Sequence, residues 1–230
     1  MKRHIITVII FLFIISFSFS QEYEIRAAMD LYRTNKVQSG EFKMILTEND
    51  IDGSPYLNDE FINGTIFTKS KSQFVNVPLR YNIYNDQIEF KTPTNEIQAL
   101  GTPEIVETVE FGNYIMVYIP YSNARKIRHG FFKVEEKGNV SLYSRLEIIY
   151  KKAEEPSGYK DASSAKFVKK SDSFYIRVGS AEAKKVDSKK ELIAIFPDHK
   201  DEIAAFIKKN KVKINKPEKL KELILYYNSL

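Results

Sequence analysis

Val75-Asn76-Val77-Pro78-Leu79-Arg80-Tyr81-Asn82-Ile83-Tyr84 is the stretch that decides the fold. Apolar side chains stand at every second position, and Asn, Pro, Arg and Tyr fill the positions between them. This period of two predicts a β-strand with one face toward a core and the other away from it. Because Pro78 cannot donate a ladder hydrogen bond, we expect an edge position or a bulge there.

Short alternating runs continue on both sides of this strand, from about Glu41 to Tyr150. Gly112-Asn113 and Gly138-Asn139 each separate two apolar runs, which is typical of tight hairpins, and Asn85-Asp86 predicts another reversal. We count seven to nine strands. The pattern predicts an antiparallel β-domain over residues 21–150, built as a meander, a sandwich or a partly closed barrel.

The composition changes after this domain. Residues 151–164 are rich in Lys, Glu, Pro, Ser and Gly, which predicts a linker. Residues 165–230 predict a small second module, in which a hairpin across Gly179-Ser180 is followed by three amphipathic helices. The expected fold class is therefore α+β.

Each of the three helices has a predicted N-cap. A polar side chain at this position accepts a hydrogen bond from a free backbone N–H group of the first turn. The predicted caps are Ser188 with Glu191 as a capping box, Asp198, and Asn215 with Glu218.

Residues 1–20 predict a secretory signal peptide, because Lys2 and Arg3 precede an apolar run that ends at Ser18-Phe19-Ser20. The apolar run is shorter than the roughly 20 residues that span a bilayer as a helix. We therefore expect cleavage after Ser20 and an exported, soluble mature chain without a transmembrane segment. The chain contains no cysteine, so it is not expected to be a lipoprotein or to contain disulfides.

The chemistry that the mature chain could perform is limited by its composition. Its formal net charge falls from +5 to +3 without Lys2 and Arg3, which is too small to predict a nucleic-acid partner. The absence of cysteine excludes a thiol nucleophile, and His129 and His199 alone cannot form a three-histidine metal centre. No catalytic or phosphate-binding motif is present. We expect no cofactor, no metal ion and no catalytic residue, although two distant carboxylates could still hydrolyse a glycosidic bond.

The first candidate binding face contains Arg80, Asn82 and Tyr84, which point away from the apolar side of the strand. Arginine and tyrosine dominate binding hot spots, so this face is a binding hypothesis. The alternative is structural, because a strand arginine commonly pairs with a cross-strand carboxylate such as Glu89.

Two further groups of residues are weaker candidates. Tyr114 and Tyr118 share one face of a strand and could line a sugar or lipid site, with core packing as the alternative. Arg125 and Arg128 could bind an anionic ligand, with a solvated loop as the alternative. Seven lysines between residues 208 and 221 could contact anionic headgroups or an acidic polymer, or could form the wet side of amphipathic helices.

Three segments carry a resemblance: Gly53-Ser54-Pro55-Tyr56-Leu57, Val77 to Tyr84, and the ending Leu223-Ile224-Leu225-Tyr226-Tyr227-Asn228-Ser229-Leu230. They look like segments of exported proteins of Bacteroidota, over most of the mature chain. The resemblance brings no activity and no site residues. It implies the periplasm or the outer surface of a Gram-negative cell.

The sequence as a whole favours a non-enzymatic exported envelope protein with a binding or scaffolding role, whose partner would be an envelope protein, a glycan or a lipid. Its oligomeric state is left open. A first alternative is a carrier for a lipid or small ligand, with a cavity lined by Phe67, Phe74, Tyr114 and Phe132. A second is a hydrolase that uses paired carboxylates.

Overall fold

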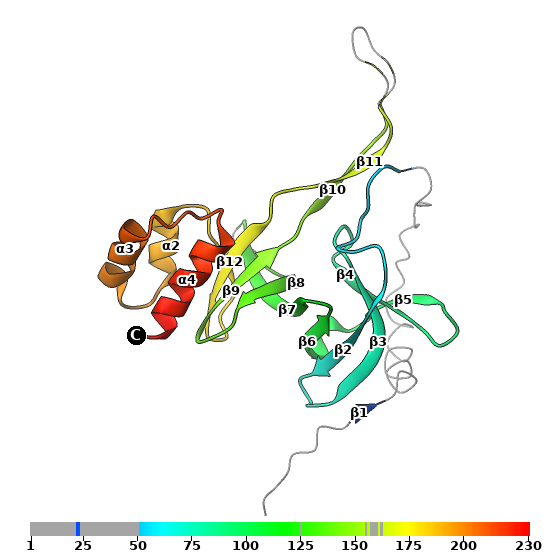
Figure 1. Ribbon diagram of the computed structural model, residues 1–230, viewed down its shortest axis with the longest axis horizontal. Helices are drawn as coiled ribbons and strands as arrows, with labels where there is room; N and C mark the ends of the chain where they lie inside the picture. Colours follow the sequence, from blue (N-terminus) through cyan, green and yellow to red (C-terminus); the bar gives the residue numbers. More distant parts are fainter. Residues whose placement is uncertain (1–21, 24–50, 125, 155, 157–160, 162) are drawn as a thin grey trace, which may run out of the picture.

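The computed structural model describes residues 22–23, 51–124, 126–154, 156, 161 and 163–230 (Figure 1). The predicted signal peptide at residues 1–20 lies outside these residues, and so does the candidate Arg125. None of the described helices combines the length and the apolar character needed to cross a bilayer.

The described chain is organised around one sheet of eleven strands and three helices. Ten strands follow the order β13-β12-β9-β8-β7-β6-β2-β3-β4-β5, in which neighbours pair in antiparallel fashion, and β1 pairs in parallel with β3. This confirms the α+β class with an antiparallel sheet, whereas the predicted count of seven to nine strands was too low, because the main sheet alone has eleven. The strands are β1 (Glu22–Tyr23), β2 (Ile62–Thr68), β3 (Gln73–Asn82), β4 (Gln87–Lys91), β5 (Ile97–Ala99), β6 (Val106–Phe111), β7 (Tyr114–Asn123), β8 (Lys126–Glu136), β9 (Val140–Arg145), β12 (Ser173–Val178) and β13 (Lys184–Lys185).

Strand β3 has the predicted alternation from Val77 onward, but Val75 was wrongly placed on the core face: it is half-buried, and Phe74 belongs to the core instead. Val77, Leu79 and Tyr81 are buried and almost fully inaccessible. Pro78 pairs with Asn63 of β2 but lies beyond the end of β4, whose pairing with β3 begins at Leu79. The register shift between β2 and β3 falls on the N-terminal side of Pro78, where Asn76 has a positive φ of 54°.

The sheet separates its core into three clusters. Neighbouring residues on β8 show this directly, because Phe131 belongs to the first cluster and Phe132 to the third. Since side chains alternate along a strand, these two clusters lie on opposite faces of the sheet. The residues of the first cluster come mainly from β2, β3, β4 and β6, and those of the third come mainly from β7, β8, β9 and β12.

The position of strands β12 and β13 differs from the expected organisation. The hairpin predicted for a separate C-terminal module instead extends the main sheet, because β12 pairs with β9 over six residues from Ser173↔Arg145 to Val178↔Val140. Immediately before β13, Ala183 exchanges backbone hydrogen bonds of 2.9 and 3.0 Å with Pro120 and Ser122 of β7. The β13 end of the sheet thus curves back and contacts β7.

The predicted linker joins two strands that pair with each other. Strands β10 (Ile148–Lys151) and β11 (Lys166–Lys169) form an antiparallel pair, and Glu154 bridges Ser163 farther out. They project from the sheet as a narrow arm (Figure 1).

The three helices cover β9 and β12 and form the second core cluster with them. They are α2 (Lys189–Ile195), α3 (Lys200–Lys209) and α4 (Pro217–Asn228), grouped at one end of the molecule (Figure 1). Ser188 is the N-cap of α2, as predicted, and accepts a hydrogen bond of 3.2 Å from the N–H of Glu191, which is one of the two bonds of the predicted capping box. The other two predicted caps were wrong, because α3 begins after His199 and α4 after Lys216, neither with a capping side-chain hydrogen bond.

Asp198 instead accepts a hydrogen bond from the hydroxyl of Tyr227 on α4. Burial, followed by this hydrogen bond, raises the pKa of Tyr227 to about 12. In the unfolded chain a tyrosine has a pKa of about 10. Because folding raises this pKa, Tyr227 stabilises the folded state fully below about pH 10, and this stabilisation is lost as the pH rises toward 12.

A titration followed by phenolate absorbance should therefore show one fewer tyrosine that ionises at high pH in Tyr227→Phe than in the wild type. Identical absorbance curves for the two proteins at alkaline pH would contradict the raised pKa of Tyr227.

Candidate functional site

Arg80 lies at the centre of the candidate site, on the outer face of β3. Its side chain forms an ion pair with Glu89 of β4, with Nη2 and Nε 2.8 and 3.3 Å from Oε2. Nη1 donates to the carbonyl oxygen of Asp59 at 3.1 Å. The cross-strand pairing proposed as the structural alternative is therefore present, and Arg80 is only 8% exposed.

The segment that covers this face is the chain before β2. Leu57 N–H donates to the carbonyl of Tyr81, and Ile83 N–H donates to that of Pro55, both at 2.9 Å. This pairing places the ring of Tyr56 over the guanidinium of Arg80, with 3.4 Å between Cζ and the ring centroid. Phe61 lies 4.5 Å from the same Cζ atom, so the guanidinium has two aromatic neighbours as well as a carboxylate.

A hollow of about 380 Å³ opens beside Arg80. Its lining comes from the covering segment, β3 and β11, which brings together parts of the chain more than a hundred residues apart. The lining residues are Gly53, Ser54, Pro55, Tyr56, Asp59, Arg80 and Phe167.

The polar groups of the hollow are only partly used by the fold. A guanidinium has five N–H groups, and three hydrogen bonds join that of Arg80 to Glu89 and Asp59. The carboxylate of Asp59 is exposed and accepts a hydrogen bond from the hydroxyl of Ser54. The hollow therefore has donors, acceptors and an aromatic surface within one small volume.

The other two residues of this candidate face have different roles. Asn82 is buried, where its Nδ2 donates to Glu89 at 2.9 Å and its Oδ1 accepts from the N–H of Asn85 at 3.0 Å. Tyr84 is 44% exposed, and its ring packs edge-on against Phe167 at 5.2 Å. Asn82 thus supports the turn after β3, while Tyr84 does not line the hollow and contacts its lining residue Phe167.

Tyr114 and Tyr118 lie away from this hollow. Both pack against the first core cluster from partly buried positions, Tyr114 beside Phe111 and Tyr118 beside Phe131. The ring of Tyr118 also stacks on that of His129 at 6.0 Å. Burial is the largest cause of the raised pKa of Tyr118. These contacts agree with the core-packing alternative.

Arg128 is exposed on β8, opposite Tyr121 of β7, near the tip of the β7–β8 hairpin. Ile127 beside it is 65% exposed. Neither residue lines the hollow beside Arg80.

A partly buried polar cluster, which we call the clasp, was not predicted from the sequence. Asp86 accepts hydrogen bonds from Tyr81 Oη at 2.7 Å, from Phe131 N–H at 3.1 Å and from Arg145 Nη2 at 2.9 Å. Arg145 also lies over the rings of Tyr121 and Phe132, at 4.7 and 5.2 Å. Burial, together with the adjacent Asp86 carboxylate, raises the pKa of Tyr81 well above its usual value. The clasp connects the β3–β4 turn with β8 and β9.

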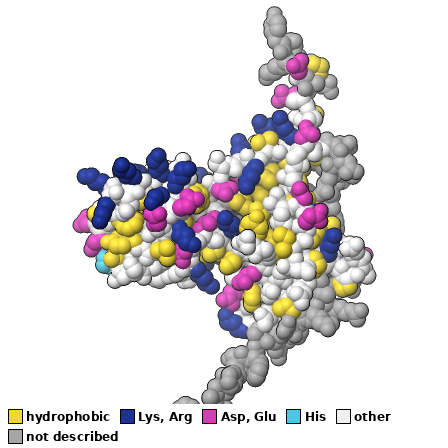
Figure 2. Space-filling model, in the orientation of Figure 1, with side chains coloured by type: hydrophobic (Ala, Val, Ile, Leu, Met, Phe, Trp, Pro, Cys, Tyr) yellow, Lys and Arg dark blue, Asp and Glu magenta, His cyan; other side chains and the backbone are white. Residues whose placement is uncertain are grey.

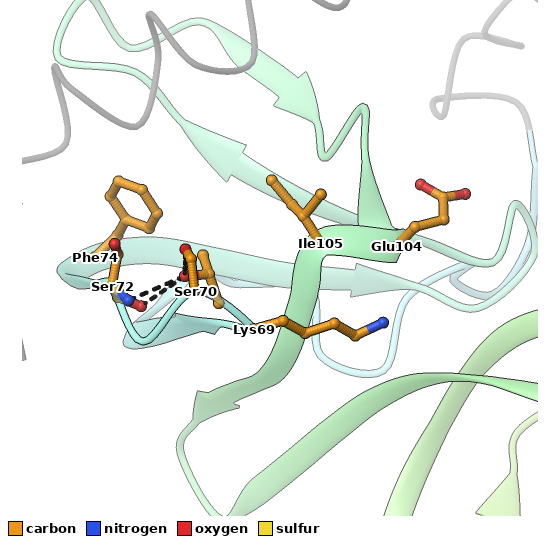
Figure 3. A pocket seen from close by; sticks show the side chains of 7 residues that line it. Lys69, Ser70, Ser72, Phe74, Glu104 and Ile105 are labelled. Carbon is orange, nitrogen blue, oxygen red and sulfur yellow. Dashed lines mark hydrogen bonds between the residues drawn. The ribbon is translucent and has the colours of Figure 1, made fainter. Parts of the chain in front are cut away.

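A second hollow, of about 370 Å³, lies at the turn between β2 and β3 (Figure 3). Lys69, Ser70, Ser72 and Glu104 line it with Phe74 and Ile105, and Thr68 completes the lining. The hydroxyl of Thr68 is 2.9 Å from that of Ser70 and donates to the carbonyl of Ser72 at 3.1 Å. These short-range bonds hold the turn itself.

The residues expected to line a carrier cavity do not come together. Phe74 is buried in the first core cluster and Phe132 in the third, on opposite faces of the sheet. Tyr114 packs against the first cluster, while Phe67 is half-buried on β2.

Comparisons with protein-family models, with curated proteins and with solved structures found no match for this chain.

Proposed function

We propose that the protein is a non-enzymatic binding protein of the cell envelope and that the hollow beside Arg80 binds a glycan. The observation that carries the proposal is the composition of this hollow, where aromatic rings adjoin a carboxylate, a hydroxyl and a guanidinium. A small pocket with an apolar surface and a few converging polar groups is the general form of a ligand site.

A saccharide matches this lining better than a purely apolar or purely anionic ligand. Its C–H face packs on aromatic rings such as Phe167, while its hydroxyl groups donate to Asp59 and accept from Arg80. A strongly anionic ligand is disfavoured, because Glu89 already neutralises Arg80 and Asp59 adds a negative charge. A lipid tail would leave the same polar groups without partners, which costs free energy.

The lining also supports a binding role over glycoside hydrolysis. Asp59 is the single carboxylate residue that lines the hollow beside Arg80, and Glu104 is the single one that lines the second hollow. Hydrolysis of a glycosidic bond generally uses two carboxyl groups on either side of that bond. Neither of these two hollows supplies such a pair from its lining.

The test is a titration of the purified mature chain with envelope oligosaccharides, in which binding is monitored by the NMR chemical shifts of the backbone amides. Peptidoglycan disaccharides and neutral and uronic-acid oligosaccharides are suitable probes. We expect at least one of them to shift the amides of Gly53, Ser54 and Phe167. Asp59→Asn should weaken this binding by about tenfold to a hundredfold, since a hydrogen bond with a charged group contributes about 1.5–3 kcal/mol.

Glu60→Gln is the matched control, because Glu60 is also exposed, adjoins Asp59 in sequence and does not line the hollow. It should bind as the wild type does. Equal weakening by both substitutions, or shifts confined to other parts of the chain, would reject the hollow as the site.

A further inference from the structure

The helical end of the molecule has a concentrated positive surface. Lys208, Lys209, Lys211, Lys213 and Lys216 are all exposed and lie at the end of α3 and in its connection to α4. We call these five residues the basic surface. Lys and Arg side chains gather over the helical end, on the left of the view in Figure 2.

The charge of the basic surface is not neutralised within the described part of the chain. Residues 206–216 contain five lysines and no aspartate or glutamate. Among the described residues none of the five forms an ion pair, whereas nearby Lys219 and Lys221 pair with Glu222 and Glu136 at 2.7 and 3.0 Å. The basic surface therefore keeps its positive potential, while the neighbouring lysines do not.

Helix stability explains only part of this arrangement. Lys208 and Lys209 occupy the last turn of α3, where a positive charge interacts favourably with the helix dipole. Lys216, in contrast, is the N-cap of α4, where a positive charge is unfavourable and no side-chain hydrogen bond caps the helix. Lys211 also has a positive φ of 50°. An anionic partner would offset the repulsion among these charges.

Apolar side chains on the same helices indicate the kind of anionic partner. Phe206 of α3 stacks on Tyr226 of α4 at 4.5 Å, with both rings only partly buried, and Leu225 is 49% exposed. Phe206 lies one helical turn before Lys209. Lysines next to aromatic and leucine side chains are typical of surfaces that bind at the interface of an anionic membrane. A soluble polyanion would use the lysines and leave the apolar groups in water.

We propose that the basic surface docks the protein on a membrane that contains anionic phospholipid headgroups. This goes beyond glycan binding and uses none of the residues that line the hollow beside Arg80. The lysine ammonium groups interact with lipid phosphates, and Leu225 and the Phe206–Tyr226 pair contact the headgroup boundary.

The test is flotation of the mature chain with vesicles of phosphatidylcholine, alone or mixed with phosphatidylglycerol. We expect binding to the mixed vesicles at low ionic strength, little binding to phosphatidylcholine alone, and release by high salt. The variant Lys208→Gln, Lys209→Gln, Lys211→Gln, Lys213→Gln should bind about tenfold more weakly or worse, because each lysine near the surface contributes substantially. All four side chains are exposed, so the fold should be retained.

The control variant removes four exposed lysines from the arm: Lys151→Gln, Lys152→Gln, Lys166→Gln, Lys170→Gln. It has the same net charge and should bind as the wild type. Equal loss in both variants would attribute the binding to net charge and overturn the proposal. So would a lack of binding to the mixed vesicles, or lysine-dependent binding to soluble polyphosphate without vesicle binding. Glycan titration of the vesicle-deficient variant should be unchanged, which separates the two proposals.

Discussion

Gly64→Ala is expected to destabilise the protein by about 3 kcal/mol or more, or to prevent folding. A Cβ atom at this position would overlap the backbone carbonyl oxygen of Glu110 on β6, and it would lie 2.7 Å from Phe111 Cβ and 2.9 Å from Leu79 Cδ1. The carbonyl cannot move away without disturbing the β2–β6 pairing, in which Gly64 is paired with Phe111. Urea denaturation followed by circular dichroism measures the loss.

Gly101→Ala is the matched control. A Cβ atom at Gly101 would have no atom within 4 Å, and the φ of Gly101 is not positive. Its unfolding free energy should stay within about 0.5 kcal/mol of the wild type. If Gly64→Ala and Gly101→Ala unfold at similar urea concentrations, β2 and β6 are farther apart at Gly64 than the structure has them.

Arg145→Met is expected to lower the free energy of unfolding by about 2 kcal/mol. The substitution removes the ion pair with Asp86 and leaves that carboxylate partly buried with two hydrogen-bond donors instead of three. Such a loss is below that of a fully buried ion pair, because the two side chains remain 23% and 26% exposed. The cation–π contacts with Tyr121 and Phe132 are lost as well.

A double-mutant cycle distinguishes the clasp from a general effect of losing an arginine. The double variant Asp86→Asn, Arg145→Met should lose less free energy of unfolding than the two single variants lose together. Arg128→Met, at an exposed arginine, should change stability little. Additive effects of the two clasp substitutions would argue against a direct interaction. Gly130→Ala provides an independent check, since a Cβ atom there would lie 2.7 Å from Asp86 Oδ2 and would overlap Arg145 Nη1.

Much of the local structure could be predicted from the sequence. Gly112 and Asn113 form the two-residue loop between Phe111 and Tyr114, and Gly112 has the positive φ of 55° that such a loop favours. The position of the C-terminal hairpin could not be predicted in this way. The alternation in β12 is equally compatible with a separate hairpin, and its place in the sheet depends on pairing with β9, which is distant in sequence.

The candidate site was predictable in its residues but less so in its environment. Arg80 and Asn82 are not part of the first core cluster, Tyr84 is exposed, and Arg80 does pair with Glu89. The sequence gives no sign that Tyr56 and Phe61 cover Arg80, because their contacts depend on the path of the preceding segment. The clasp was missed for a similar reason, since Asp86 and Arg145 are 59 residues apart.

The return of the chain from Ala183 to β7 also affects self-association. A strand at the border of a sheet exposes unpaired N–H and C=O groups, to which another chain can add its own strand. Here the β13 border is shielded by the hydrogen bonds of Ala183 with Pro120 and Ser122, and the opposite border, β5, has three residues. The main described sheet therefore offers a second copy only a short template for strand addition at its β5 border.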